Sequence, residues 1–343
     1  MNKELLTTAN ALLKNLYALK EGEVFVVTAD EGNDKAVIEA VAEAAKELGA
    51  KVLTIYMPTP AGVGMAADAG IASKALFGAL SAADAWAEFN TKWIYGGRTY
   101  IRVMEANKKL RHMNLTGATT ALISNCIGKV DYVRLRKFGL CFAEMIRNGK
   151  NFRMTSSAGM NVSFSNMSGR PILCELGEAD QAGTHMLPGQ IAWTPDTESV
   201  NGTIVFDGAL APVCGIPSAP VKVDILNGQV QRFYGAPEAE KYFAWLKSYS
   251  DPQMMKISHT GLGVNPGARL SGDILQDQRV WGSATWAFGS IGANLVPPEG
   301  VPGASHSDCV ALQISLWIDG QEIIQEGTVV HKELSELAEG LAR

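Results

Sequence analysis

Histidine is the side chain best suited to metal binding and proton transfer near neutral pH, and this chain of 343 residues contains only five. Two of the five lie in segments whose neighbours indicate strand structure. His306 and Asp308 are separated by one residue and precede the apolar run at 309–316. Because side chains alternate along a strand, residues two apart project from one face. We therefore predict that this pair chelates a single metal ion.

A third metal ligand is predicted from a separate segment. His259 lies in the extended stretch 257–263, which runs into glycines. Two imidazoles and one carboxylate form the facial triad that binds non-haem Fe(II) and leaves coordination positions open for dioxygen and substrate. The residues alone leave an alternative open, in which the histidines only form hydrogen bonds. A surface or hydrogen-bonding role is what we expect for His112 and His331.

The sequence gives no specific support to a nucleotide site or to a serine or cysteine nucleophile. The loop at residues 29–34 has one glycine, lacks the G-x-G-x-x-G spacing and carries three acidic residues that would repel a pyrophosphate. No G-x-S-x-G motif marks a nucleophilic serine. The five cysteines are widely spaced and form no Cys-x-x-Cys pair, so we interpret them as buried thiols in a reducing compartment.

Composition and charge narrow the class of protein. Hydrophobic residues make up 47% of the chain and charged residues 19%, a balance typical of globular proteins. The net charge of −5 comes without a basic stripe, which argues against a nucleic-acid partner. The amino terminus lacks the apolar core of a signal peptide, and no apolar run approaches the roughly 20 residues that span a bilayer. We therefore expect a cytoplasmic protein without a membrane partner.

The elements that must position the predicted ligands divide the chain into two parts. In the first part, apolar periodicity predicts a strand at residues 24–28, a helix over 37–45 and a strand at 51–56, which together form a strand–helix–strand unit. Later segments repeat the alternation, with a helix at 73–85, a strand at 119–125 and a helix at 132–148. Residues 1–150 are therefore predicted to form a doubly wound α/β domain.

The second part, residues 151–343, is predicted to be a strand-rich α+β domain that carries the metal site. Asn227-Gly228 and Asp319-Gly320 each lie between two strand-like runs and predict hairpin turns. The predicted fold class is thus α/β, with an N-terminal doubly wound domain followed by an α+β domain.

Several motifs around the predicted ligands also occur together in known enzymes. They are residues 238–240 with 249–252, residues 257–261 with Pro266, residues 306–308, and an earlier block at 174–185 with 188–190. In these motifs the chain resembles the metallo-aminopeptidases of the aminopeptidase T type. It resembles more closely their divergent relatives, the 2,5-dihydroxypyridine 5,6-dioxygenases.

Departures from the peptidase pattern favour the dioxygenases. Gln190 stands where the peptidases have a carboxylate, and His259 stands where they have a glutamate ligand. A further ligand histidine of the peptidases has no counterpart between Trp281 and Asn294. The loss of two anionic ligands removes much of the charge that would hold two divalent ions close together.

The resemblance implies a mononuclear Fe(II) enzyme of aromatic catabolism that opens a hydroxylated pyridine-like or aromatic ring with dioxygen. It implies His259, His306 and Asp308 as metal ligands, and Glu175 and His185 as residues that handle substrate protons. It also implies a homo-oligomer. Two alternatives stay open: a hydrolase that uses zinc or another divalent ion to activate water, and a binding protein with a vestigial site.

Overall fold

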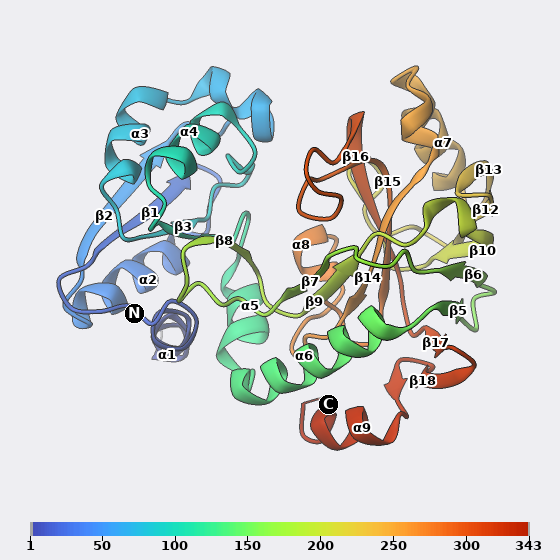
Figure 1. The fold of residues 1–343 in the computed structure, drawn as a ribbon. Helices are drawn as coiled ribbons and strands as arrows, with labels where there is room; N and C mark the ends of the chain where they lie inside the picture. The colour runs from blue at the N-terminus through green and yellow to red at the C-terminus, as the bar shows by residue number, and fades with distance from the viewer. Residues whose placement is uncertain (1–2, 342–343) are drawn as a thin grey trace. The chain divides into compact units, whose positions relative to one another are not determined.

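The computed structural model describes residues 3–341, a mixed α/β fold with three sheets (Figure 1). The chain divides into two compact units. The first unit comprises the chain up to Val130 together with Glu175–Pro188, and the second unit comprises Asp131–Cys174 together with the chain from Gly189 onward. Each unit is described by itself below.

The first unit is built on a five-stranded parallel sheet of order β2-β1-β3-β4-β8. The strands are β1 (Val24–Asp30), β2 (Lys51–Met57), β3 (Ala85–Glu88), β4 (Arg111–Asn114) and β8 (Gly183–Met186). The helices are α1 (Lys3–Ala11), α2 (Lys35–Glu47), α3 (Ser73–Ser81), α4 (Arg98–Ala106) and α5 (Thr120–Ile123). Phe25, Val26 and Trp86 are fully buried, as expected for a parallel sheet whose strands are covered on both faces.

The predicted strand–helix–strand unit is confirmed by β1, α2 and β2. The strand predicted at residues 119–125 is wrong, because this segment forms α5 followed by a π-helical turn at Ser124–Gly128. The Thr119 hydroxyl accepts a hydrogen bond from the backbone N–H of Leu122 and so caps the start of the helix. A short apolar run fits a buried helix as well as a buried strand, and here the cap decides.

The boundary between the units differs from the expected division at residue 150. Helix α6 (Tyr132–Asn148) begins after the N-cap Asp131 and belongs to the second unit, where it packs against α9 (Lys332–Ala338). The chain later re-enters the first unit at 175–188 and adds β8 beside β4. Pairing between strands about seventy residues apart leaves no local signal in the sequence.

The second unit contains an eight-stranded sheet of order β13-β12-β10-β6-β5-β17-β18-β19 and a six-stranded sheet of order β11-β16-β15-β14-β9-β7. The first of these sheets consists of β5 (Asn151–Thr155), β6 (Asn161–Ser165), β10 (Asn201–Phe206), β12 (Val221–Leu226), β13 (Gln229–Gly235), β17 (Ser315–Ile318), β18 (Gln321–Gln325) and β19 (Thr328–Val329). The second consists of β7 (Ile172–Glu175), β9 (Gln190–Trp193), β11 (Ala209–Leu210), β14 (Ile257–Gly263), β15 (Ala284–Ile291) and β16 (Val301–Ala311). The remaining helices are α7 (Glu238–Ser248) and α8 (Ile274–Asp277).

Both predicted hairpin turns are confirmed. Asn227 and Gly228 join β12 to β13 with φ angles of 50° and 72°, and Asp319 and Gly320 join β17 to β18 with φ angles of 48° and 83°. Two consecutive residues with positive φ give the turn whose twist matches that of the flanking strands, which explains the Asn-Gly and Asp-Gly pairs.

No helix within residues 3–341 combines the length and the apolar composition that a bilayer-spanning segment needs.

Candidate metal centre

Three adjacent strands of the six-stranded sheet build the candidate site. His259 lies on β14, and His306 and Asp308 lie on β16, with β15 between the two strands. In the β15–β16 ladder Ala287 is opposite Asp308 and Gly289 is opposite His306. Opposed residues of an antiparallel pair point to the same face. The middle strand therefore presents only small residues beneath the site, which leaves room for imidazole side chains from either side to meet.

A strand irregularity lies at His259. The ladder between β14 and β15 shifts register between Ile257 and Thr260, and the histidine lies within that shift. An extra residue in one strand redirects the side chains around it. Ser258 and His259 are the two residues that lie within this irregularity.

The three residues predicted as ligands lie together. One potential ligand atom from each of His259, His306 and Asp308 is within 4.8 Å of the others, and this is the one such group of metal-ligating side chains within residues 3–341. Asp308 Oδ1 is 3.5 Å from His259 Nε2 and 3.3 Å from His306 Nε2. The two imidazole rings are nearly parallel, with centroids 5.2 Å apart and an interplanar angle of 7°.

These separations fit a shared ion. Ligand atoms about 2.1 Å from one metal and roughly at right angles are about 3 Å apart. His306 Nδ1 donates to the Ser290 carbonyl at 2.8 Å, which leaves the lone pair of Nε2 directed at the cluster. Among the described residues, the buried Nδ1 of His259 has no hydrogen-bond partner. The donor set of two nitrogens and one carboxylate oxygen is that of a facial triad.

The electrostatics of the cluster favour a cation. Burial raises the pKa of Asp308, but the charges of His306 and His259 and a hydrogen bond from the Gln278 side chain outweigh it and lower the pKa to about 2. Burial lowers the pKa of His259 to about 4 despite the Asp308 charge. Burial also disfavours the charged form of His306, yet the Asp308 carboxylate and the Ser290 carbonyl raise its pKa. At neutral pH the site thus contains an ionised carboxylate and a neutral His259.

Access to the cluster is uneven. The side chain of His259 is 10% exposed and that of Asp308 is 19% exposed, whereas the His306 side chain retains 36% exposure. An ion held by the three atoms would therefore have protein on one side and an open approach on the side of His306.

Comparison with known proteins gives a match over nearly the whole chain. The family model of 2,5-dihydroxypyridine 5,6-dioxygenase matches residues 6–331. The chain belongs to this dioxygenase family. The resemblance in the motifs around His259, His306 and Asp308 is thereby confirmed at the level of the family.

Individual relatives are distant. A curated 2,5-dihydroxypyridine 5,6-dioxygenase of Pseudomonas putida is 24% identical over 201 residues, which cover 56% of this chain and 57% of the relative, so the chain spans little more than half the length of that relative. The solved structure of a 2,5-dihydroxypyridine dioxygenase from Pseudomonas putida KT2440 has a TM-score of 0.78 at 20% identity, covering 96% of this chain and 98% of the other. Wild-type AmpT from Thermus thermophilus has a TM-score of 0.70 at 14% identity, covering 96% and 99%. These structures share the fold.

Glu175 and His185, the residues expected to handle protons, belong to the first unit, whereas the three residues predicted as ligands belong to the second. Glu175 is the last residue of β7, and His185 is in β8, where its Nε2 donates to the Gln181 carbonyl at 2.9 Å. Burial lowers the pKa of His185, and the Gln181 carbonyl opposes this shift. The roles of Glu175 and His185 stay predictions.

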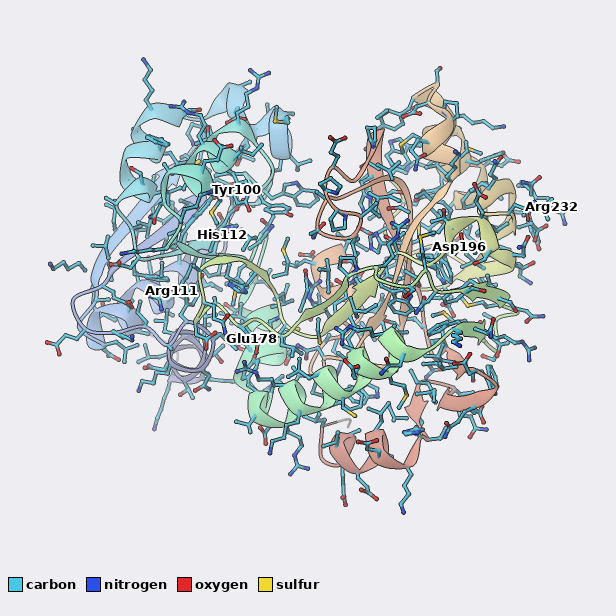
Figure 2. The ribbon with its side chains drawn as sticks, viewed as in Figure 1. Tyr100, Arg111, His112, Glu178, Asp196 and Arg232 are labelled. Carbon is cyan, nitrogen blue, oxygen red and sulfur yellow. The ribbon has the colours of Figure 1, made fainter. Side chains whose placement is uncertain are left out.

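His112 is in a setting that the sequence did not predict. A hydrogen-bonding role is confirmed, but a surface location is wrong, because His112 and Glu88 are both fully buried (Figure 2 labels His112). His112 Nε2 is 3.0 Å from Glu88 Oε2, Nδ1 is 3.2 Å from the Thr184 hydroxyl, and the ring lies against Trp86 at 4.1 Å. The basic residues before β4 are typical of an exposed segment, so the sequence did not indicate that β4 is a short buried strand.

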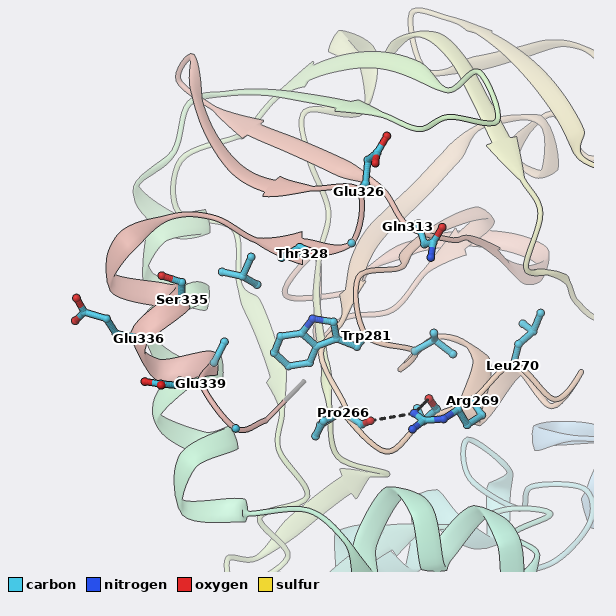
Figure 3. A pocket seen from close by; sticks show the side chains of 16 residues that line it. Pro266, Arg269, Leu270, Trp281, Gln313, Glu326, Thr328, Ser335, Glu336 and Glu339 are labelled. Atoms are coloured by element: carbon cyan, nitrogen blue, oxygen red, sulfur yellow. Dashed lines mark hydrogen bonds between the residues drawn. The ribbon is translucent and has the colours of Figure 1, made fainter. Parts of the chain in front are cut away.

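A cavity of about 840 Å³ in the second unit does not include the predicted ligands. Trp281 and Arg269 are among the residues that line it, and Arg269 Nη1 donates to the carbonyls of Pro266 and Ala268 (Figure 3). None of His259, His306 and Asp308 lines it. The cluster of potential metal ligands therefore lies outside this cavity.

Proposed function

We propose that this protein is a mononuclear non-haem Fe(II) dioxygenase that opens a hydroxylated pyridine-like or aromatic ring, with His259, His306 and Asp308 as the iron ligands. The observation that carries the proposal is the meeting of two imidazole nitrogens and one carboxylate oxygen within 4.8 Å, in a chain of a dioxygenase family. Bound there, Fe(II) would supply the redox chemistry that joins dioxygen to an electron-rich ring.

The residues of the chain would prepare this site in three ways. Asp308 stays ionised because its pKa is about 2, so it contributes a full negative charge to the cation. The Ser290 carbonyl fixes the ring orientation and tautomer of His306. The partial exposure of His306 leaves one side of the ion accessible to a small ring substrate and dioxygen.

Proton transfer is assigned to Glu175 and His185 on the strength of the family resemblance. Ring opening of a hydroxylated ring requires that a hydroxyl proton leave and that a proton return to the product. The lowered pKa of His185 keeps its imidazole neutral at neutral pH and able to accept a proton. Replacing His185 by Gln should therefore lower kcat while the affinity for Fe(II) stays that of the parent protein.

Oxygen consumption tests the proposal against a zinc hydrolase. Metal-free protein would be loaded anaerobically with Fe(II) or with Zn(II) and then mixed with 2,5-dihydroxypyridine or a related aminophenol in air. We expect oxygen uptake stoichiometric with ring loss for the Fe(II) protein alone. His331→Ala, a histidine substitution outside the predicted site, is the matched control and should retain uptake. Turnover with Zn(II) in the absence of oxygen would instead establish a hydrolase.

A further inference from the structure

The face of β16 opposite the candidate metal centre carries a second set of polar contacts. Ser307 and Cys309 alternate with His306 and Asp308 along the strand, so their side chains point away from the ligands. Ser307 is 3% exposed and Cys309 is fully buried. Hydroxyl and thiol groups buried in this way need partners.

Ser307 and Cys309 share one hydrogen-bond partner, the hydroxyl of Tyr242. Tyr242 of α7, itself fully buried, places its hydroxyl 2.6 Å from Ser307 Oγ and accepts a hydrogen bond from Cys309 Sγ at 3.0 Å. Burial raises the pKa of both Tyr242 and Cys309 well above their usual ranges, so each keeps its proton. With the thiol donating to the phenol oxygen, the phenol proton is directed at Ser307. One hydroxyl thus connects the two residues that flank Asp308.

The Tyr242 ring is fixed from several sides. Its centroid lies 5.4 Å from that of Phe233, 5.6 Å from that of Trp245 and 6.5 Å from that of Phe288. Aromatic contacts at these distances stabilise defined ring orientations. The hydroxyl is therefore held by packing and by its own hydrogen bonds.

The segment of β16 that carries the predicted ligands has extensive strand pairing on one edge and little on the other. On the β15 side the ladder runs continuously past Asp308, Ser307 and His306. On the other side β11 is two residues long and pairs only Val310 and Cys309. The backbone N–H of Ala211 also donates to the Asp308 carbonyl at 3.1 Å. Beyond Asp308, at Ser307 and His306, β11 gives no further pairing, so side-chain contacts carry more of the positioning there.

We propose that Tyr242 is a positioning residue of the metal centre, whose hydroxyl binds Ser307 and Cys309 on the far face of β16 and thereby sets the pleat that directs His306 and Asp308 at one ion. The inference rests on the proposed metal site. Ligands must be held to within about 0.5 Å of their productive positions, and removal of an outer-sphere partner costs about 10- to 100-fold in metal affinity.

Cobalt binding to Tyr242→Phe tests the inference without any need for turnover. Metal-free protein would be titrated with Co(II) while its visible absorption, which reports coordination geometry, is recorded. We expect a dissociation constant raised by up to about tenfold, the low end of the range for outer-sphere partners, because Tyr242 acts through the strand neighbours of the ligands, with altered band positions. Tyr17→Phe is the matched control, because Tyr17 is also fully buried and its hydroxyl donates to the Trp86 carbonyl at 2.7 Å in the first unit. That variant should bind Co(II) like the parent.

A second pair of variants separates hydrogen bonding from packing. Cys309→Ser keeps a donor to the Tyr242 oxygen and should retain the parent spectrum, whereas Cys309→Val has a similar volume without the donor and should shift it. If Tyr242→Phe does not fold, Ser307→Ala removes the other partner and should weaken Co(II) in the same way.

Two outcomes are distinguishable. Parent protein that binds Co(II) stoichiometrically, with unchanged affinity and spectrum in Tyr242→Phe, overturns the inference and leaves the proposed function intact. Parent protein that binds no Co(II) overturns the metal site itself.

Discussion

Within residues 3–341, imidazole lies beside carboxylate in a group of each unit, and the two groups differ in how completely their polar atoms are hydrogen-bonded. In the first unit, Glu88 accepts hydrogen bonds from His112 and from the backbone N–H groups of Ile94 and Tyr95, and both nitrogens of His112 have partners. Neither side chain is exposed. Such a group is closed, as is typical of a buried structural hydrogen-bond network.

The group in the second unit is arranged differently. Asp308 Oδ1 faces two imidazole nitrogens at 3.3 and 3.5 Å, His306 keeps a 36% exposed side chain, and His259 Nδ1 lacks a partner among the described residues. Lone pairs from two imidazole rings and a carboxylate thus converge, and hydrogen bonds within the described residues do not use all of their polar atoms. Residue type therefore does not separate a structural pair from a candidate ligand set, whereas the extent of hydrogen bonding does.

The largest expected effect is on metal affinity in Asp308→Asn. The substitution removes the only anionic ligand of the proposed set, so affinity for Fe(II) or Co(II) should fall by more than about 100-fold, beyond the range seen for outer-sphere residues. Titration calorimetry of metal-free protein measures the change. An Asp308→Asn protein with the affinity of the parent would remove the distinction between the two groups.

Glu88→Ala should lower the stability of the fold and leave the metal affinity unchanged, the reverse of what we expect for Asp308→Asn. It leaves the His112 imidazole and two backbone N–H groups without their buried acceptor, so we expect a loss of about 3–5 kcal/mol in the free energy of unfolding. Urea denaturation followed by circular dichroism reports the loss. Metal affinity measured below the unfolding transition should not change, and a large fall in affinity would mean that this closed group serves the metal centre directly.

The pH dependence of metal binding should involve one proton first, that of His306, whose pKa is raised. The pKa of His306 is raised, so below that pKa the metal must displace its proton and affinity should fall by about tenfold per pH unit. Above the pKa of His306 the affinity should level off. His259 has a pKa of about 4 and Asp308 of about 2, so a steeper fall begins only below about pH 4. Calorimetry in two buffers of different ionisation enthalpy counts the protons; release of two at pH 6 would contradict this assignment.

The smallest expected effect concerns the orientation of the Asp308 carboxylate. Gln278 donates a side-chain hydrogen bond to it. Gln278→Ala should weaken Co(II) binding by about tenfold at most, at the low end for an outer-sphere partner, and should raise the pKa of Asp308. Asp308 carboxyl titration by NMR in metal-free protein is the second readout. No change in either quantity would show that the two imidazoles alone orient the carboxylate.

Local patterns in the sequence were sufficient for much of the fold. The apolar, β-branched run at Val24 predicted β1, and the Asn227-Gly228 pair predicted a hairpin through the positive φ angles that it adopts. The H-x-D spacing placed His306 and Asp308 on one strand face. These features depend on a few neighbouring residues, so the sequence shows them directly.

Features that depend on distant pairing could not be predicted. The return of β8 to the first unit, the strand shift at His259 and the burial of His112 each depend on partners far along the chain. The contact of Tyr242 with Ser307 and Cys309 spans more than sixty residues and follows only from the packing of α7 on the sheet.

Elemental analysis tests directly whether His259, His306 and Asp308 hold an iron ion. The protein would be produced with iron in the medium and purified without a chelator or a metal-affinity tag. We expect about one iron per chain in the parent protein and in His331→Ala, with iron lost from His259→Ala. A parent protein without a stoichiometric metal, or a His259→Ala protein that retains its iron, would contradict this expectation.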